Sequence, residues 1–175
     1  MDMGLEESVP SSSKILLVYY SRTGTTRRIA EEIRESLGCD VEEVVDKKSR
    51  SDLLGWLRAG RDGGAGNLTC IGLGVRDVSE YDLMILGTPI WNGKVSAPIR
   101  TYVVENRGRL PEVAFFSTQD GEENKAFDEM EGLCEKPPVA AVQLVSKREI
   151  ETGEYKGKLE GFLSVVSAHF LGGVP

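Results

Sequence analysis

The most constraining feature of the chain is an apolar run that stops abruptly at a short, hydroxyl-rich loop. Residues 15 to 20 are apolar or aromatic, Ser21 to Thr26 are mostly small or hydroxyl-bearing, and a helical pattern follows. This order predicts a buried strand, a tight loop and the start of a helix. The first N–H groups of a helix lack intrahelical partners and carry the positive end of its dipole, so such a loop is typical of a phosphate cradle. Gly24 would let the backbone turn closely there.

Three arginines lie in or beside this loop. Arg27 and Arg28 fall in the first helical turn, where the helix dipole disfavours cations, and Arg22 lies in the loop itself. A bound phosphate would make this concentration of positive charge favourable. The arginines could equally point into solvent, and the sequence leaves both interpretations open.

Length and charge narrow the class of protein. With 175 residues, a single domain is expected over residues 14–175, after a disordered polar tail at residues 1–13. Lys and Arg total 21 against 28 Asp and Glu, and the net charge of -7 argues against nucleic acid and anionic membranes as partners. The acidic balance fits a basic protein partner. No apolar run has membrane-spanning length and no signal-peptide pattern is present, so we expect no membrane span and a cytoplasmic location.

The cysteines and the histidine argue against a disulfide framework or a metal site. Cys39, Cys70 and Cys134 are widely spaced, and His169 is the only histidine. The thiols are expected to pack as small apolar groups in a reducing compartment. No pairing of a nucleophile with a base is visible, so we predict no catalytic residue and no metal ligand.

Alternating apolar runs and helical patterns predict an α/β fold. Strands are expected at residues 14–20, 40–46, 83–87, 113–116 and 139–145, and helices at about 25–37, 51–58, 98–106, 122–134 and 154–170. Residues 60–67 contain four glycines and are expected to form a loop, whereas residues 69–77 have no clear pattern. Continuously apolar strands indicate a sheet covered on both faces. The sequence therefore predicts an open, five-stranded parallel sheet with helices on both sides.

Three predicted loops follow strands one, three and four, so they share the carboxyl edge of the sheet, where such folds bind ligands. They are Ser21–Thr26, Thr88–Ala97 and Ser117–Gly121. The first suits a phosphate, the second offers the indole of Trp91 beside a flexible turn, and the third offers polar groups. A ligand with a phosphate at one end and a flat heterocycle at the other would use all three.

These loops resemble those of the flavodoxin family. Ser21-Arg22-Thr23-Gly24-Thr25-Thr26 matches the family's phosphate loop, [ST]-x-T-G-x-T, directly after the first strand, and the other two loops are similar to its two flavin loops. The similarity covers roughly residues 14–170. It implies a flavodoxin-like three-layer sandwich with strand order 2-1-3-4-5 and FMN as the cofactor. The short connection before the last helix resembles short-chain flavodoxins, and the chain departs from the family in an extra stretch around residues 47–77.

The resemblance implies a role for each loop residue. Phosphate contacts fall to Ser21, Thr23, Gly24, Thr25 and Thr26, with Arg22 contributing its backbone; one side of the isoalloxazine falls to Thr88, Pro89, Ile90, Trp91, Asn92 and Gly93; and the pyrimidine edge falls to Ser117, Thr118, Gln119, Asp120 and Gly121.

Two residues of the second loop carry further expectations. Trp91 lies between a proline turn and Asn-Gly, which favours an exposed loop and a stacking contact with the flavin. Lys94, next to that turn, would raise the reduction potential if it lies near the ring, or it could point into water.

Three functions fit the pattern. The first is an FMN electron carrier between redox protein partners. The second is an FMN-dependent NAD(P)H:quinone-type oxidoreductase, because the third loop has no aromatic residue and would leave one flavin face open to a small quinone or nicotinamide, or to the second subunit of a homodimer. The third is a module of this fold without FMN, which the intact phosphate loop disfavours.

Overall fold

The computed structural model of the chain describes residues 13–47, 68–72, 74–122 and 124–171. The helix expected at 51–58 and the glycine-rich loop expected at 60–67 lie outside the described residues, as does the predicted tail except for Ser13.

Five strands form a parallel sheet in the order β2-β1-β3-β5-β6, which confirms the predicted order of the main strands. Their bounds are β1 Ile15–Tyr19, β2 Asp40–Glu43, β3 Leu83–Trp91, β5 Glu112–Gln119 and β6 Pro138–Val145. One further strand, β4 (Lys94–Val95), was not predicted and pairs antiparallel with the end of β3.

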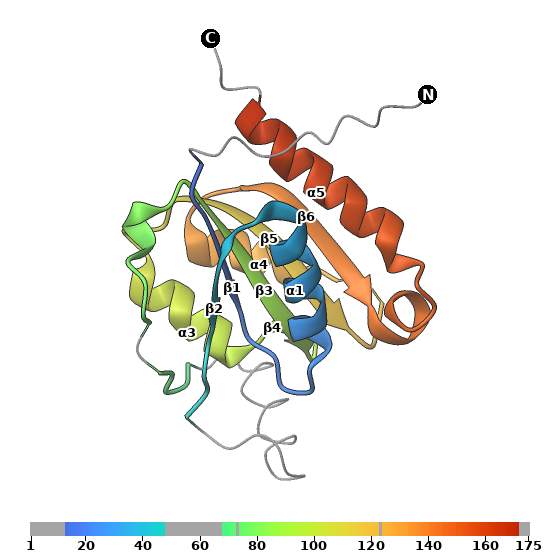
Figure 1. Cartoon of the computed structure of the whole chain (residues 1–175). Coiled ribbons are helices and arrows are strands. Elements are labelled where there is room, and N and C mark those ends of the chain that lie inside the picture. The colour runs from blue at the N-terminus through green and yellow to red at the C-terminus, as the bar shows by residue number, and fades with distance from the viewer. Residues whose placement is uncertain (1–12, 48–67, 73, 123, 172–175) are drawn as a thin grey trace.

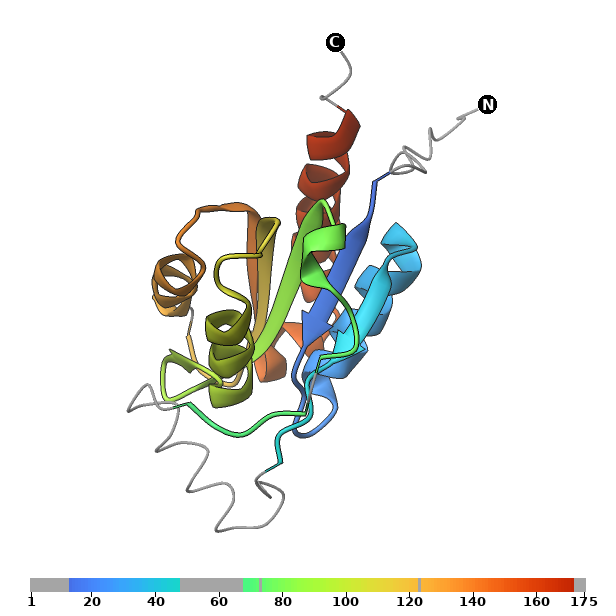
Figure 2. The ribbon, with the colours of Figure 1, turned by 90° about the vertical axis from the view of Figure 1, so that its left-hand side faces the viewer.

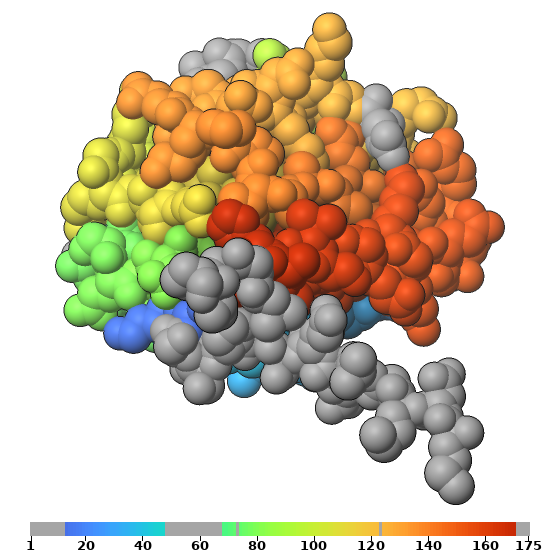
Figure 3. Space-filling model, turned by 90° about the horizontal axis from the view of Figure 1, so that it is seen from above, coloured from blue at the N-terminus to red at the C-terminus, as the bar shows by residue number. Residues whose placement is uncertain are grey.

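Helices cover both faces of the sheet. They are α1 (Thr25–Leu37), α3 (Ala97–Asn106), α4 (Ala126–Cys134) and α5 (Tyr155–Leu171). Figures 1 and 2 show α1 and α5 on one face and α3 and α4 on the other. Figure 3 views the molecule from above the orientation of Figure 1, with α5 (red) across this face. The three-layer sandwich expected from the resemblance is confirmed.

Alternate side chains of each strand supply two separate cores. Leu16 and Val18 of β1 face α3 and α4, whereas Ile15 and Leu17 face α1 and α5. All four are at most 4% exposed. Burial on both faces explains why this strand is apolar without alternation, and it supplies most of the favourable free energy of folding.

Helix α1 has the bounds that the sequence predicts, because a glycine marks each end. Gly24 is its N-cap with φ 99°, and Gly38 is its C-cap with φ 62°. Only glycine adopts this left-handed backbone without a steric penalty. Ile29 and Ile33 are fully buried and attach the helix to the sheet.

Several predicted boundaries were wrong. β3 continues to Trp91 and β5 to Gln119, so Thr88–Trp91 and Ser117–Gln119 are strand rather than loop. Both extensions are stabilised by pairing with each other, in the register Thr88 to Ser117 and Pro89 to Thr118. Such pairing between distant segments leaves no local pattern in the sequence.

Helix α4 begins at Ala126 instead of the predicted residue 122. Two irregular elements were not predicted: a 3₁₀ turn η1 covers Val78–Glu80, and a π-helical turn η2 covers Ser146–Ile150. Of residues 69–77, which the sequence left unassigned, Ile71 forms an isolated bridge with Asp46.

The cysteines differ from one another in burial. Burial raises the pKa of the Cys134 thiol to about 12 and that of Cys39 to about 11, so both are unreactive thiols near neutral pH. Cys70 is exposed, so the expectation that it packs as an apolar group was wrong. Within the described ranges, no group of His, Cys, Asp and Glu side chains could hold a metal ion.

None of the described helices is both long and apolar enough to span a bilayer.

Candidate functional site

The three candidate segments meet at the carboxyl edge of the sheet. Thr88 and Ser117 are register partners across β3 and β5. The hydroxyl oxygens of Thr26, in the first turn of α1, and Thr118, on β5, lie 2.7 Å apart in a buried hydrogen bond. Tyr20 N–H donates to the carbonyl of Gly87 at 3.2 Å. Segments far apart in the sequence therefore lie side by side at this edge.

The first segment has the backbone geometry of an anion cradle. Gly24 N–H donates to Ser21 Oγ at 3.1 Å, which fixes the turn. No side chain of the described residues caps the N-terminus of α1, and no acidic residue lies in its first turn. A Cβ built on Gly24 would meet nothing within 4 Å, so the backbone there faces open space. Uncapped N–H groups at the positive end of the dipole can bind a phosphate.

The two helical arginines are held by acidic neighbours rather than by this loop. Arg27 lies 2.6 Å from Glu43, and this hydrogen bond raises the pKa of its guanidinium. Arg28 lies over the ring of Tyr155, with 5.6 Å from its guanidinium carbon to the ring centroid, and 3.6 Å from Glu32. The sequence left open whether these arginines favour a bound phosphate or point into solvent. In the structure both arginines are surface residues that pair with carboxylates.

The second segment is a hairpin, and Trp91 is buried in it. Asn92 (φ 54°) and Gly93 (φ 73°) form the turn between β3 and β4, with Trp91 and Lys94 as register partners. Positive φ at both turn residues is the geometry that Asn-Gly favours in tight hairpins. Trp91 packs edge-on against Tyr20, with ring centroids 5.6 Å apart, and only 9% of it is exposed. The expected exposed position of Trp91 was therefore wrong.

A buried ion pair holds the base of this hairpin. The Arg100 guanidinium donates to Glu129 at 2.7 Å and to the carbonyl of Val95 at 2.9 Å, and Val95 N–H donates to the other oxygen of Glu129 at 3.2 Å. The Arg100 side chain is 4% exposed and that of Glu129 20%. The pair thus joins α3, α4 and β4 behind the turn.

The hydroxyl groups of Thr88 and Ser96 form a second contact at the base of the hairpin. Ser96 N–H donates to the Thr88 hydroxyl at 3.1 Å, and the two hydroxyl oxygens are 2.9 Å apart. Sequence reasoning missed Ser96, Arg100 and Glu129. The signal for Arg100 was a single charge inside the otherwise uncharged stretch Ala97–Val104 of α3.

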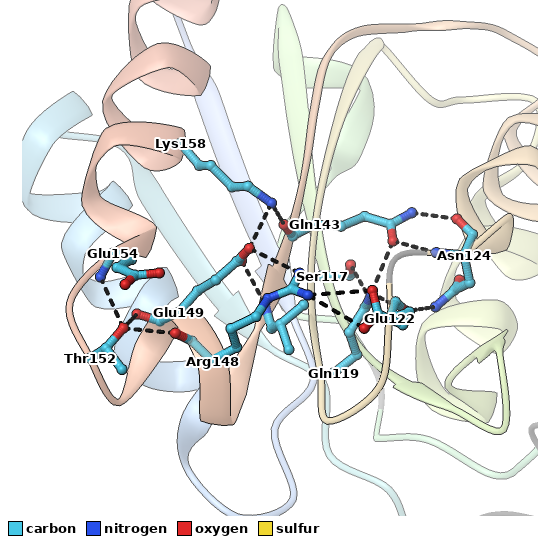
Figure 4. A network of polar contacts seen from close by, with 11 residues as sticks. Ser117, Gln119, Glu122, Asn124, Gln143, Arg148, Glu149, Thr152, Glu154 and Lys158 are labelled. Carbon is cyan, nitrogen blue, oxygen red and sulfur yellow. Dashed lines mark hydrogen bonds and ion pairs between the residues drawn. The ribbon is translucent and has the colours of Figure 1, made fainter.

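A network of side-chain amides positions the third segment (Figure 4). Gln119 Nε2 donates to Gln143 Oε1 at 3.0 Å and to the carbonyl of Glu122 at 2.9 Å. Gln143 is also bonded to both backbone groups of Asn124, at 2.9 and 2.6 Å. The Gln119 side chain is therefore directed at its own loop, and Gln143 is another residue that the sequence did not indicate.

The network continues to the turn before α5. Glu149 accepts from Val145 N–H at 2.9 Å and pairs with Lys158 at 3.0 Å (Figure 4). Burial acts to raise the pKa of Glu149, but these two donors outweigh it and the pKa is lowered. A charged Glu149 therefore stabilises this corner at neutral pH.

The candidate residues differ in exposure. Exposed are Thr23, Asn92, Gly93, Asp120 and Gly121; partly exposed are Ser21, Arg22, Gly24, Thr25, Pro89 and Ile90; buried are Thr26, Thr88, Trp91, Ser117, Thr118 and Gln119. Each of the three segments thus has at least one exposed residue, and each also has buried members.

Among the solved structures that are similar to this chain are flavoproteins. No protein-family model matches the chain, and neither does any curated protein sequence. A flavoprotein from Lactobacillus acidophilus, solved in complex with FMN, is 26% identical with a TM-score of 0.67, over 81% of this chain and 98% of that one. The apo-form of the flavoprotein from that organism is 24% identical with a TM-score of 0.58, over 80% and 96%.

A flavodoxin gives the same result at lower identity. The two-electron reduced flavodoxin of Megasphaera elsdenii is 17% identical with a TM-score of 0.56, over 86% of this chain and 98% of that one. At this identity the likeness concerns the fold. The protein has the flavodoxin-like fold, and the suspected resemblance to flavodoxin-like flavoproteins is confirmed by its structural neighbours.

Proposed function

We propose that this protein binds FMN at the carboxyl edge of its sheet and carries electrons between redox partners. The observation that carries the proposal is the convergence of three turns, each with a glycine that faces open space. A Cβ on Gly24, Gly93 or Gly121 would meet nothing within 4 Å. Backbone N–H groups can therefore approach a ligand from all three sides.

The residues present fit FMN. The N-terminus of α1 has neither a capping side chain nor an acidic residue, as a phosphate dianion requires. Ser21, Thr23 and Thr25 carry hydroxyl groups in the same segment, and Ser21 Oγ accepts from Gly24 N–H. The exposed turns Asn92-Gly93 and Asp120-Gly121 would contact the ring, and buried Trp91 would support it from below.

Bound FMN would supply one- and two-electron redox chemistry. The chain's own residues bind the phosphate, orient the ring and set the electrostatic field around it. Electrons lost by a donor protein would be gained by an acceptor, and neither exchange requires a nucleophile or a general base from this chain.

The test is titration of the purified protein with FMN and with riboflavin, which lacks the phosphate. We expect FMN to bind at least about tenfold more tightly, because charge-assisted hydrogen bonds to the phosphate are lost with riboflavin. Equal affinity for both, or binding of neither, would contradict the proposal.

A matched pair of glycine variants locates the site. Gly24→Ala and Gly38→Ala both place a side chain at positive φ, at opposite ends of α1, where nothing lies within 4 Å. We expect similar losses of stability but weaker FMN binding for Gly24→Ala alone. Equal FMN affinity of the two variants would place the phosphate elsewhere.

A second function, an FMN-dependent NAD(P)H:quinone-type oxidoreductase, is favoured by one observation. The third segment, Ser117–Gly121, ends in the exposed residues Asp120 and Gly121 and has no aromatic residue to cover the ring. Anaerobic mixing of the FMN-loaded protein with NADH or NADPH separates the two. Rapid loss of flavin absorbance supports the enzyme, and its absence supports the carrier, for which we also propose a cytoplasmic location.

A further inference from the structure

The three arginines near the phosphate loop differ in whether their charge is compensated. Arg27 pairs with Glu43 and Arg28 with Glu32. Arg22 takes part in no ion pair within the part of the chain that the structure describes. Its guanidinium carbon instead lies 6.0 Å from the ring centroid of Trp91. Arg22 thus belongs to the phosphate loop by sequence but directs its charge toward the second segment.

The position of Trp91 makes this contact specific. Tyr20 meets its ring edge-on at 5.6 Å, and only 9% of the residue is exposed. Arg22 is itself partly exposed. A cation over an indole face is attracted by the ring's quadrupole, and partial desolvation strengthens the attraction. Arg22 therefore links the first segment to Trp91, the residue just before the exposed Asn92-Gly93 turn of the hairpin.

We propose that Arg22 is a potential-setting residue of this site, which holds Trp91 and makes bound FMN easier to reduce. The inference rests on the proposed function. Reduction adds negative charge to the flavin ring, and an uncompensated cation beside it stabilises that charge. Lys94 is also close to the turn but is exposed, so water and salt screen it more strongly.

The experiment measures the reduction potential of bound FMN against reference dyes in wild type, Arg22→Gln, Arg22→Lys and Arg27→Gln. We expect Arg22→Gln to shift the equilibrium toward oxidised FMN by about fivefold, which is the size of effect that the loss of one partly screened charge near the ring would have. Arg22→Lys keeps the charge and should remain near wild type. Arg27→Gln is the matched control, because Glu43 already compensates that arginine.

The ionic strength provides a second readout. The difference between wild type and Arg22→Gln should shrink in high salt, since salt screens a partly exposed charge. A merely structural role of Arg22 would leave the potential unchanged at every salt concentration.

The outcomes separate this inference from the proposed function. If all four proteins bind FMN and Arg22→Gln has the potential of Arg27→Gln, the role of Arg22 is overturned and FMN binding stands. If wild type binds no FMN, the proposed function fails and this inference fails with it.

Discussion

The two ends of the candidate site are built in different ways. The phosphate end, Ser21–Thr26, is formed by one continuous segment, and its turn is closed by a hydrogen bond between residues three apart, Ser21 and Gly24. The ring end is formed by β3, β4 and β5, and its shape depends on Arg100 from α3 and Glu129 from α4.

This difference explains why the structure of the phosphate end can be predicted from a single sequence and that of the ring end cannot. A strand–loop–helix transition carries its own caps and turn residues, so local physics determines it. A hairpin base held by side chains from distant helices carries no local signature. We therefore expect the ring end to depend more strongly on distant partners than the phosphate end does.

The largest effect is expected from the buried ion pair. Arg100→Met leaves Glu129 without its charge partner, and we expect a loss of about 3 kcal/mol in the free energy of unfolding, since removing one member of a buried pair is costly. Glu129 is 20% exposed, which keeps the loss at the lower end of the usual range. Urea denaturation at pH 7 measures it.

An ion pair next to the phosphate end is the control. Arg27 and Glu43 are as close, at 2.6 Å, but their side chains are 49% and 33% exposed. Arg27→Gln should cost far less, because exposed ion pairs contribute little. The double variant Arg100→Met with Glu129→Met should recover much of the lost stability. Equal losses for Arg100→Met and Arg27→Gln would erase the distinction between the two ends.

The same distinction describes what the sequence could predict. Helix α1 has the predicted bounds, Thr25–Leu37, because Gly24 and Gly38 terminate it locally. The five parallel strands follow from the apolar runs, and their order is the one that the flavodoxin resemblance implies. Strand β3 was expected to stop at Gly87, because the apolar run ends before the hydroxyl of Thr88. In the fold, Ser96 binds that hydroxyl and β5 pairs alongside.

Trp91 shows the limit most clearly. Its neighbours in sequence, a proline turn and Asn-Gly, favour an exposed position, but Tyr20, which directly follows β1, packs against it. The contact spans the two ends of the site, so neither segment alone predicts it. The amides of Gln119 and Gln143 were likewise unpredictable, because each is satisfied by a partner on another strand.

The second prediction concerns a glycine that lies beneath both ends. A Cβ on Gly87 would lie 2.1 Å from Cζ of Phe116, whereas one on Gly24 meets nothing within 4 Å. Gly87→Ala should lower the free energy of unfolding by about 2–3 kcal/mol through overpacking. A double-mutant cycle with Phe116→Leu, followed by urea denaturation, should show a favourable coupling of about 1 kcal/mol or more. Additive losses would mean that the ring of Phe116 does not limit this position.

The third prediction concerns the hydrogen bond that joins α1 to β5. Thr118→Val leaves the buried hydroxyl of Thr26 without this partner and should cost about 1–2 kcal/mol, while Thr118→Ser keeps the bond. Replacing both threonines by valine should cost less than the sum of the single losses, because no polar group is then left unpaired. Additive costs in thermal or urea denaturation would show that the two ends are not coupled through this pair.

The smallest effect is expected at the hairpin turn. There the conformation of the ring end is determined by residues adjacent in sequence, as it is at the phosphate end. Gly93 has φ 73° and open space beside it, so Gly93→Ala should cost only the backbone penalty of about 1 kcal/mol. Asn92→Gly, which relieves a positive φ of 54°, should leave stability nearly unchanged. Amide hydrogen exchange at Val95 distinguishes two explanations of any larger loss. Faster exchange in Gly93→Ala would mean that the turn determines the base of the hairpin, whereas unchanged exchange would mean that Arg100 and Glu129 hold the base without help from the turn.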